Sequence, residues 1–368
     1  MYSNAVVHVL DASKSVPVVG SLLSKGAEQT IAKYKSEYSK LAQDHQKRKS
    51  AKTILKYDEA FHNRLKTDWN AVEIVTPNRK GVKTWQPSID DLIGYIDWTP
   101  FFRAWELAGK YPNILDDKVV GDEARKLFAD AKTMLSDICE HKRFEAKGVT
   151  GIFAAESNGE TIRIEDENGA EQAFEFIRQQ RKMGDGIPNL SLADFVAPEG
   201  YGDHMGCFAV SIHGAKEMAI EFEKDHDDYH AILVKVLADR LVEAFAEYLH
   251  QEIRKNEWGY VPNEALDNDM LIREKYQGIR PAPGYPACPD HTEKQKIWQV
   301  LDVMTNTGAS LTENYAMDPA ASVSGYYFAH PQSKYFAVGQ IGEDQVDNLA
   351  TRKNVPKDAM RKWLRPNL

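Results

Sequence analysis

Four prolines between residues 281 and 289 constrain this chain more than any other feature of its sequence. A proline has no backbone N–H and fixes its own φ, and the residue before it is driven to extended conformations. The stretch from Arg280 to Lys294 is therefore expected to be a rigid, extended loop rather than a helix or a central strand. Gly284 supplies one position that can take positive φ. We expect the carbonyl groups of this loop to lack local N–H partners and to be free to accept hydrogen bonds from a ligand.

A structural connector and a ligand-binding loop are equally compatible with these residues. In a binding loop, Arg280 would hold a carboxylate through two parallel hydrogen bonds, and Tyr285 would face a cation. A loop that is ordered in advance loses little entropy when a ligand binds.

The composition indicates a soluble globular protein of one large or two smaller domains, with 42% hydrophobic and 27% charged residues in 368. The formal net charge of −9 and the absence of a basic stripe argue against a nucleic-acid partner. No secretory signal pattern and no apolar run of about 18 residues is present, so we expect no membrane association. The three widely spaced cysteines favour a reducing cytoplasm.

Hydrophobic periodicity predicts an α+β fold with surrounding helices. No regular βαβ alternation is seen, so the central sheet should be mainly antiparallel. Residues 173–181 fit either a helix or a strand. The expected helices cover residues 16–23, 29–49, 122–142, 215–254, 291–306, 344–353 and 356–364, and a further helix starts at 88–94 and continues through Trp105 and Leu107. The expected strands cover residues 5–10, 148–154, 161–165, 192–197, 205–212, 311–316, 324–330 and 335–340.

The first 25 residues look like the end of a preceding α/β domain. A strand, a polar turn and a helix form one unit of such a sheet, and a lone strand cannot bury both of its faces. The basic cluster at 45–52 is typical of a solvated linker. We therefore divide the chain into a remnant at 1–25, a helical and charged linker at 26–57 and a single large domain at 58–368.

Two groups of residues suggest chemistry, and neither is compelling. Cys288 and His291 could form a nucleophile and base, but a cysteine between prolines is equally typical of a small packed residue. His226 and His230 have a spacing that can bind a metal, yet no third ligand is evident, and a helix start at Asp227 is favoured. No dinucleotide fingerprint, P-loop or nucleophile elbow is present. The sequence thus predicts a binding module without catalytic or metal-binding residues.

Asp97 stands alone in a dense aromatic cluster, YIDWTPFF at residues 95–102. A carboxylate in such surroundings needs a partner or a ligand.

Several motifs together resemble one family, the C-terminal activation domain of cobalamin-dependent methionine synthase. The resemblance runs from about residue 55 to the end, and its motifs stand in the family's order. The opening VHVLDASK, at residues 7–14, resembles the last strand and turn of that enzyme's cobalamin-binding domain. The motifs are YIDWTPFF at 95–102, HDDY at 226–229, ADRLVEAFAEY at 238–248 and RPAPGYPACP at 280–289.

This resemblance implies a reactivation role in the methyltransferase. Such a domain binds S-adenosylmethionine (AdoMet) and gives its methyl group to cobalamin that has been oxidised to cob(II)alamin. Flavodoxin, or a flavoprotein reductase, supplies the electron. The family's cobalt-ligating Asp-x-His-x-x-Gly motif is absent from this sequence, so cobalamin should be carried by the neighbouring cobalamin-binding domain. The chain alone should then lack the full enzyme activity.

The resemblance also implies the residues of the site. Arg280 would meet the AdoMet carboxylate and Asp97 its amino group, while Glu243 would lie nearby. The remaining residues implied are the loop residues Ala282, Gly284 and Tyr285, the aromatic pair Tyr335 and Phe336, and the cobalamin-contacting Ala12.

Two alternative functions remain at this point. The chain could act chiefly as a docking module for flavodoxin and the cobalamin domain. It could instead be a self-sufficient AdoMet-dependent methyltransferase that acts on a small substrate.

Overall fold

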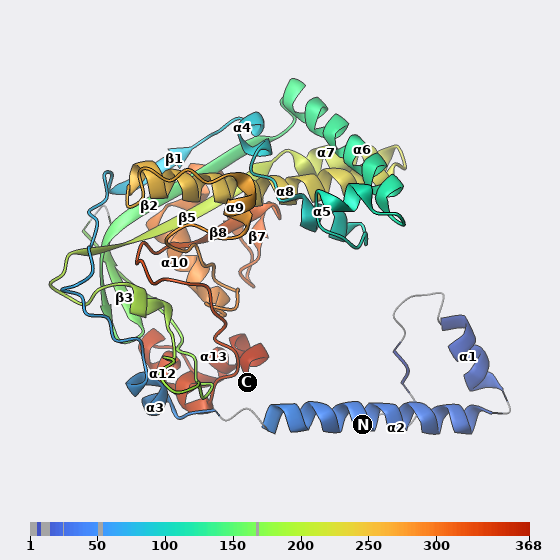
Figure 1. Cartoon of the computed structure of the whole chain (residues 1–368), viewed down its shortest axis with the longest axis horizontal. Coiled ribbons are helices and arrows are strands. Elements are labelled where there is room, and N and C mark those ends of the chain that lie inside the picture. The colour runs from blue at the N-terminus through green and yellow to red at the C-terminus, as the bar shows by residue number, and fades with distance from the viewer. Residues whose placement is uncertain (1–5, 9–14, 25, 51–53, 167–168) are drawn as a thin grey trace. The chain divides into compact units, whose positions relative to one another are not determined.

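The computed structural model describes residues 6–8, 15–24, 26–50, 54–166 and 169–368, which fall into two compact units, Met1–Leu55 and Lys56–Leu368. The first unit contains the helices α1 (Ser15–Leu23) and α2 (Ala27–Ser50), as expected (Figure 1). The backbone N–H of His8 donates to the Tyr38 hydroxyl at 2.9 Å. Residues 6–8 belong to no strand, and the rest of the predicted first strand, including Ala12, lies outside the described residues.

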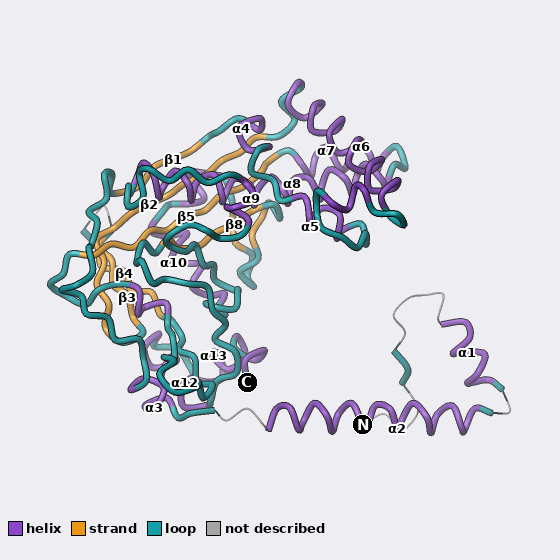
Figure 2. The backbone as a smooth tube through the Cα atoms, viewed as in Figure 1, coloured by secondary structure: helices purple, strands orange, loops and turns teal. Residues whose placement is uncertain are grey.

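The second unit is an α+β domain, which confirms the predicted fold class (Figures 1 and 2). Its strands are β1 (Gly81–Trp85), β2 (Glu145–Asn158), β3 (Thr161–Glu165), β4 (Glu171–Glu175), β5 (Asp203–His213), β6 (Ser310–Leu311), β7 (Met317–Asp318) and β8 (Ser322–Tyr327). Its α-helices are α3 (Tyr57–His62), α4 (Ile89–Ile93), α5 (Trp98–Ala104), α6 (Gly121–Glu140), α7 (Ala215–Lys224), α8 (Asp228–Glu252), α9 (Asn268–Ile272), α10 (Lys294–Val300), α11 (Val303–Thr307), α12 (Glu343–Lys353) and α13 (Lys357–Trp363). A π-helical turn, Ile253–Glu257, extends α8, and short 3₁₀ turns lie at Asn113–Asp116, Leu192–Phe195, His291–Glu293 and Arg365–Asn367.

The central sheet has the order β4-β3-β2-β5-β8, and each neighbouring pair is antiparallel. The long strand β2 organises it. One edge of β2 pairs with β5 along most of its length, and the other edge pairs first with β1 and then with β3. β6 and β7 form a separate two-stranded sheet.

Alternate residues of the central strands enter two different cores, because successive side chains of a strand point to opposite faces. In β5, Phe208, Val210 and Ile212 join the core that includes residues of α4 to α8. Met205 and Cys207 join the core on the other face, together with residues of α10 and α11. The sheet therefore carries α8 on one face and the segment after the proline loop on the other.

The C-terminal helices form a third, smaller core around Val346, Leu349 and Met360. A fully buried arginine, Arg178, lies close to this region. Its guanidinium forms a fork with Asp194 at 2.7 and 2.8 Å and donates from Nε to Glu160 at 2.5 Å. The network also reaches α12, because the Arg178 backbone N–H donates to Gln345 at 2.7 Å.

Three further predicted strands and three predicted helices differ from the structure. The helix expected to continue from 88–94 through Leu107 is interrupted between Ile93 and Trp98, where Asp97 caps α5 by accepting from the Thr99 N–H at 2.9 Å. Of the strand predicted over 192–197, residues Leu192–Phe195 form a 3₁₀ turn instead, since Asp194 accepts from the Ser191 N–H at 2.9 Å while held by Arg178. Residues 312–316 form the turn between β6 and β7. Residues 335–340 are in no strand. They lie beside the proline loop instead, and the Val338 N–H donates to the Pro286 carbonyl at 2.8 Å.

The helix predicted over 215–254 is two helices. Asp227 caps the start of α8 by accepting from the His230 N–H at 3.0 Å, and His226 before it has a left-handed φ of 58°. The helix predicted over 291–306 is similarly divided at Asp302, where φ is 43°. Across the described residues, no helix is both long and apolar enough to cross a membrane.

Candidate functional site

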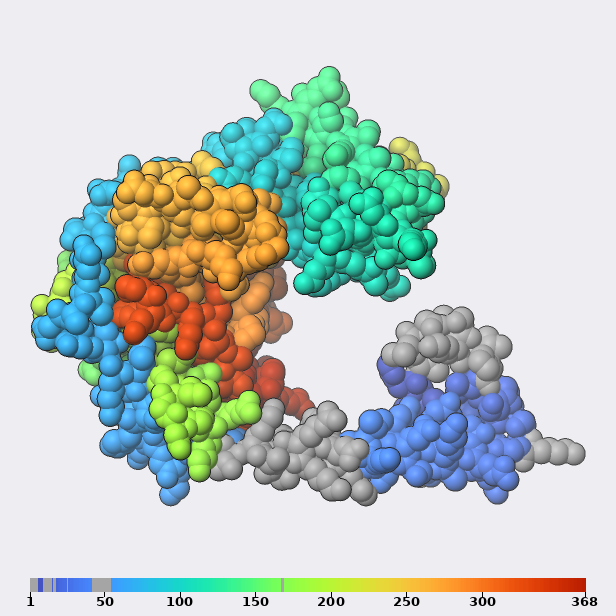
Figure 3. All heavy atoms as spheres, in the orientation of Figure 1, coloured from blue at the N-terminus to red at the C-terminus, as the bar shows by residue number. Residues whose placement is uncertain are grey.

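A pocket of about 170 Å³ brings together three of the residues that the sequence singled out, Asp97, Glu243 and Arg280. Four segments form its wall: the α4–α5 connection, α8, the stretch from α9 to Tyr276, and the first residue of the proline loop. Figure 3 shows the orange surface that includes α9 beside the cyan and teal surface of α4 and α5. The remaining wall residues are Tyr95, Arg240, Ala244, Glu247, Leu271, Ile272, Glu274 and Tyr276.

Helix α8 supplies one wall through its regular spacing. Arg240, Glu243 and Glu247 lie three and four residues apart, so they share one face of the helix. The opposite face of α8 is apolar and packs on β5 and β8. The sheet thus fixes the position of the charged face.

Asp97 lies at the start of α5 and is its N-cap residue. Its Oδ1 accepts from the Thr99 N–H at 2.9 Å, which is the role that aspartate commonly takes at this position. Neighbouring Tyr95 anchors the segment to α8, because its hydroxyl donates to Gln251 at 2.6 Å. Trp98, Phe101 and Phe102 are packed into or against the core, so the aromatic cluster fixes the carboxylate beside the pocket.

Arg280 is held from three directions. Its guanidinium forms an ion pair with Glu247 at 2.9 Å and donates to the Tyr276 hydroxyl at 3.1 Å. Its backbone N–H donates to the Tyr335 hydroxyl at 3.0 Å. A guanidinium has five N–H donors, so these contacts leave donors for a ligand.

Tyr335 and Phe336 point in different directions. The Tyr335 hydroxyl reaches Arg280, whereas the Phe336 ring packs against the core with its centroid 6.4 Å from that of Phe195. The structure therefore brings the Tyr335 hydroxyl to Arg280, although Tyr335 is not a wall residue of the pocket, and it places the Phe336 ring in the core. A ligand contact of Phe336 stays a prediction.

The proline loop differs from expectation in its carbonyl groups. Gly284 has the positive φ that was predicted, at 93°, and turns the loop back on itself. Its N–H donates to the Cys288 carbonyl at 2.7 Å, and the Ala282 carbonyl accepts from Tyr285 at 3.2 Å. The Pro281 carbonyl accepts from Tyr326 of β8 at 2.9 Å. The expectation of free carbonyls is wrong for these groups, because the turn at Gly284 brings the loop's own N–H groups to two of them and β8 supplies the donor for the third.

Gly284→Ala should destabilise the domain more than Gly339→Ala does. Both glycines have positive φ, which costs an alanine about 1–2 kcal/mol. A Cβ at Gly284 would also overlap the His291 ring, whereas a Cβ at Gly339 meets no atom within 4 Å. Urea unfolding of the two variants measures the difference, and equal losses would show that the His291 contact relaxes without cost.

Cys288 and His291 are structural in this arrangement. Cys288 is buried, and burial together with the Glu293 and Asp290 carboxylates raises the pKa of its thiol far above the usual value. The thiolate needed for nucleophilic attack is thereby disfavoured. Asp290 and Glu293 form ion pairs with Lys353 of α12, which fixes the end of the loop.

The second candidate pair, His226 and His230, lies at the start of α8. His230 Nδ1 is 2.7 Å from Asp227 Oδ2, and the His230 ring stacks on Phe222. The expected polar helix start is confirmed. Within the described part of the chain, no group of three or more His, Cys, Asp or Glu side chains could hold a metal ion.

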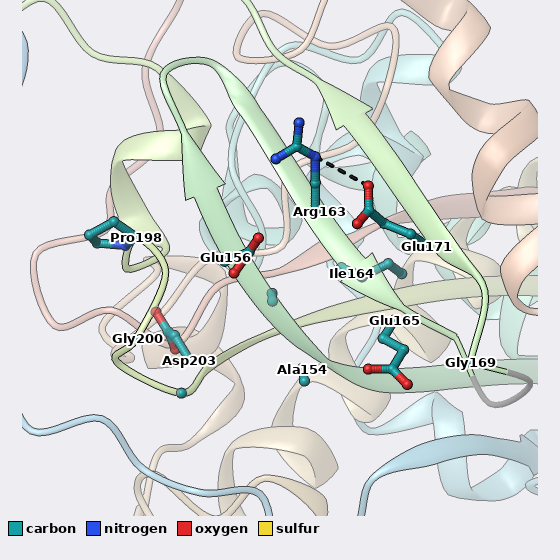
Figure 4. A pocket seen from close by; sticks show the side chains of 12 residues that line it. Ala154, Glu156, Arg163, Ile164, Glu165, Gly169, Glu171, Pro198, Gly200 and Asp203 are labelled. Atoms are coloured by element: carbon teal, nitrogen blue, oxygen red, sulfur yellow. Dashed lines mark ion pairs between the residues drawn. The ribbon is translucent and has the colours of Figure 1, made fainter.

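A larger pocket of about 730 Å³ lies over β2 and β3 and the turn that ends at Asp203 (Figure 4). Its charged wall residues are mainly acidic, with Glu156, Glu165 and Asp203 among them. Its Arg163 is paired with Glu171 at 3.2 Å. Because it contains none of the residues that the sequence singled out, we take the smaller pocket as the functional site.

The family model for the activation domain of vitamin B12-dependent methionine synthase matches residues 88–354. This match spans most of the chain and includes every wall residue of the smaller pocket. The chain belongs to this family.

The activation domain is also similar to a solved structure, the crystal structure of the MetH reactivation domain bound to AdoHcy. The two share 51% sequence identity with a TM-score of 0.83, and the match covers 86% of this chain and 98% of that one. The resemblance inferred from the motifs is thus confirmed, together with the α+β fold.

Sequence reasoning missed Glu247 and Tyr276, although both contact Arg280 of the activation domain. A signal for Glu247 was present, since it follows Glu243 by four residues on a predicted helix. Tyr276 carries no comparable signal. It reaches Arg280 only because the chain after α9 folds back onto α8.

Proposed function

We propose that this activation domain binds AdoMet in the pocket of Asp97, Glu243 and Arg280 and takes part in cobalamin reactivation. AdoMet would supply a methyl group to cobalamin held by the neighbouring domain. The observation that carries the proposal is the placement of Arg280 and Asp97 in one pocket, in a chain 51% identical to a reactivation domain bound to AdoHcy.

The charges of the pocket fit the amino-acid end of AdoMet. Arg280 offers guanidinium donors to a carboxylate, and Asp97 offers a carboxylate to an ammonium group. The nearby carboxylates of Glu243 and Glu274 would favour the positive sulfonium. The pocket is smaller than the roughly 300–1,000 Å³ of sites that enclose a drug-sized ligand, so it suits this end of the molecule rather than all of it.

The other loop residues expected at the site, Ala282, Gly284 and Tyr285, are not wall residues of this pocket. Tyr285 is 56% exposed, and burial of the rest of its ring and the Glu243 carboxylate raise its pKa. Ala282 and Gly284 lie two and four residues after Arg280 and would meet the part of the ligand that extends beyond the pocket through backbone atoms.

This domain needs no acid or base for methyl transfer, because the leaving thioether departs without a proton. The wall residues of the pocket would bind and orient the ligand instead. In this proposal the chain works with a cobalamin-binding domain and with flavodoxin or a flavoprotein reductase, and it lacks the complete methyltransferase activity by itself. We assign it to the cytoplasm, where its thiols Cys139, Cys207 and Cys288 would stay reduced.

Titration of AdoMet into the purified protein should show saturable binding that Asp97→Asn weakens by about 5- to 30-fold. The asparagine keeps the oxygen that caps Thr99 and removes only the negative charge that would hold the ligand ammonium. Isothermal titration calorimetry measures the affinity, and thermal unfolding checks that the helix cap persists.

Asp227→Asn is the matched control, because it makes the same change at the N-cap of α8, outside the pocket. It should leave AdoMet affinity unchanged. No AdoMet binding by the folded wild-type protein would refute the proposed function. Equal affinities of the wild type and Asp97→Asn would remove Asp97 from the site.

A further inference from the structure

A chain of four alternating charges runs from the pocket into the protein, through Arg280, Glu247, Arg254 and Glu264. Glu247 Oε2 lies 2.9 Å from Arg280, and Glu247 Oε1 lies 3.8 Å from Arg254. Arg254 then holds Glu264 with Nε and a terminal nitrogen at 2.9 and 2.7 Å. Arg280 and Glu247 both line the pocket, and Arg280 is the more exposed of the two, at 19% against 9%. The side chains of Arg254 and Glu264 behind them are at most 6% exposed.

The contacts along this chain are unequal. The Glu264 and Arg254 pair is bidentate, and the Glu247 contact with Arg280 is short. By contrast, neither Glu247 Oε1 nor the Arg254 terminal nitrogen facing it has a hydrogen-bond partner among the described residues. The strongest contact of Glu247 is therefore the one with Arg280, and Glu247 makes it from helix α8.

Tyr276 supplies the second support of Arg280. Its hydroxyl accepts from the Arg280 guanidinium at 3.1 Å, and its ring lies under the Arg254 guanidinium at 4.3 Å. Arg254 thus restrains both supports of Arg280. Each of these groups except Arg280 comes from outside the proline loop, so the pocket's cation is oriented by the rest of the domain.

We propose that Glu247 is a positioning residue that holds the Arg280 guanidinium in the orientation needed to receive a ligand carboxylate. This inference rests on the proposed function, since the carboxylate is that of AdoMet. A free arginine side chain loses rotamer entropy when it is fixed on a ligand, and prior ordering removes most of that loss from the binding step.

Glu247 favours binding by orienting Arg280, but its negative charge acts against binding of the same ligand. A second carboxylate near Arg280 repels the incoming carboxylate, so removal of the charge alone should not weaken binding. Burial raises the pKa of Glu247, and the Arg280 and Arg254 guanidinium groups oppose that rise. Orientation and charge can therefore be separated by comparing Glu247→Gln, which keeps an acceptor oxygen for Arg280, with Glu247→Ala, which does not.

The test measures the affinity of each variant for AdoMet and for decarboxylated AdoMet, which keeps the amino group and the sulfonium. Glu247→Gln should bind AdoMet within about threefold of the wild type or more tightly. Glu247→Ala should bind AdoMet about 10- to 30-fold more weakly than Glu247→Gln. Both variants should bind decarboxylated AdoMet equally well, because that ligand does not use the Arg280 fork.

Two results would overturn the inference: equal AdoMet affinities of the two variants, or an equal loss for both ligands in Glu247→Ala, which indicates a merely structural role. Tyr276→Phe provides a variant independent of the folding of Glu247→Ala, since it keeps the ring under Arg254 and removes only the hydroxyl. It should weaken AdoMet binding and spare decarboxylated AdoMet. Absence of AdoMet binding by the wild type would instead count against the proposed function.

Discussion

Arg280→Ala should weaken AdoMet binding by about 30- to 150-fold. A bidentate contact between a guanidinium and a carboxylate is worth about 2–3 kcal/mol, which corresponds to that range of affinity. The substitution also leaves Glu247 without its 2.9 Å partner, so its carboxylate would then repel the ligand carboxylate. Isothermal titration calorimetry on the folded variant measures the loss.

Arg273→Ala is the matched control for this experiment. Arg273 lies seven residues before Arg280, its side chain is 66% exposed, and its ion pair with Asp269 lies outside the pocket wall. It should bind AdoMet like the wild type. Arg280→Lys should give an intermediate affinity, because lysine keeps the charge and loses the planar fork. If folded Arg280→Ala kept wild-type affinity, the assignment of Arg280 would be wrong.

Arg178→Ala should lower the free energy of unfolding of the domain by about 3–5 kcal/mol. Removal of one partner from a buried ion pair leaves the other charge uncompensated in the interior. Here two carboxylates, Glu160 and Asp194, would lose the same guanidinium. Burial already raises the pKa of Asp194 even with Arg178 present, which shows how unfavourable its surroundings are for a charge. Chemical denaturation measures the change.

Arg361→Ala should change stability by less than about 1 kcal/mol, since Arg361 is 58% exposed and pairs with Glu343 at the surface. A triple variant, Arg178→Ala with Glu160→Gln and Asp194→Asn, should recover part of the loss because it removes both uncompensated charges. A loss in Arg178→Ala as small as that in Arg361→Ala would show that water or local rearrangement replaces the guanidinium.

The elements with strong local patterns could be predicted from the sequence. Alternating or continuous apolar residues identified β5, and the helical period identified α6 and α12. Several errors fall on segments whose conformation depends on distant partners. Leu192–Phe195 form a 3₁₀ turn, with Asp194 held by Arg178, and residues 335–340 lie beside the proline loop instead of joining the sheet.

Only part of the candidate site could be predicted from the sequence. Asp97 and Arg280 stand in motifs that mark the family, and the structure places both at one pocket. Tyr276 and the charge chain behind Arg280 could not be predicted, because their contacts join α8, the segment after α9 and the proline loop. Contacts between segments so far apart leave no periodic or motif signal in the sequence.

Local chemistry is enough to predict that residues 281–289 form an irregular loop with a turn at Gly284, because proline fixes φ and glycine tolerates positive φ. What that loop can do depends on contacts that form only when the chain folds. β8 and Val338 supply N–H groups to the Pro281 and Pro286 carbonyls, and Glu247, Tyr276 and Tyr335 hold Arg280. Backbone restriction acts between neighbouring residues, whereas the orientation of a charged side chain depends on partners that only folding brings within 3 Å or so.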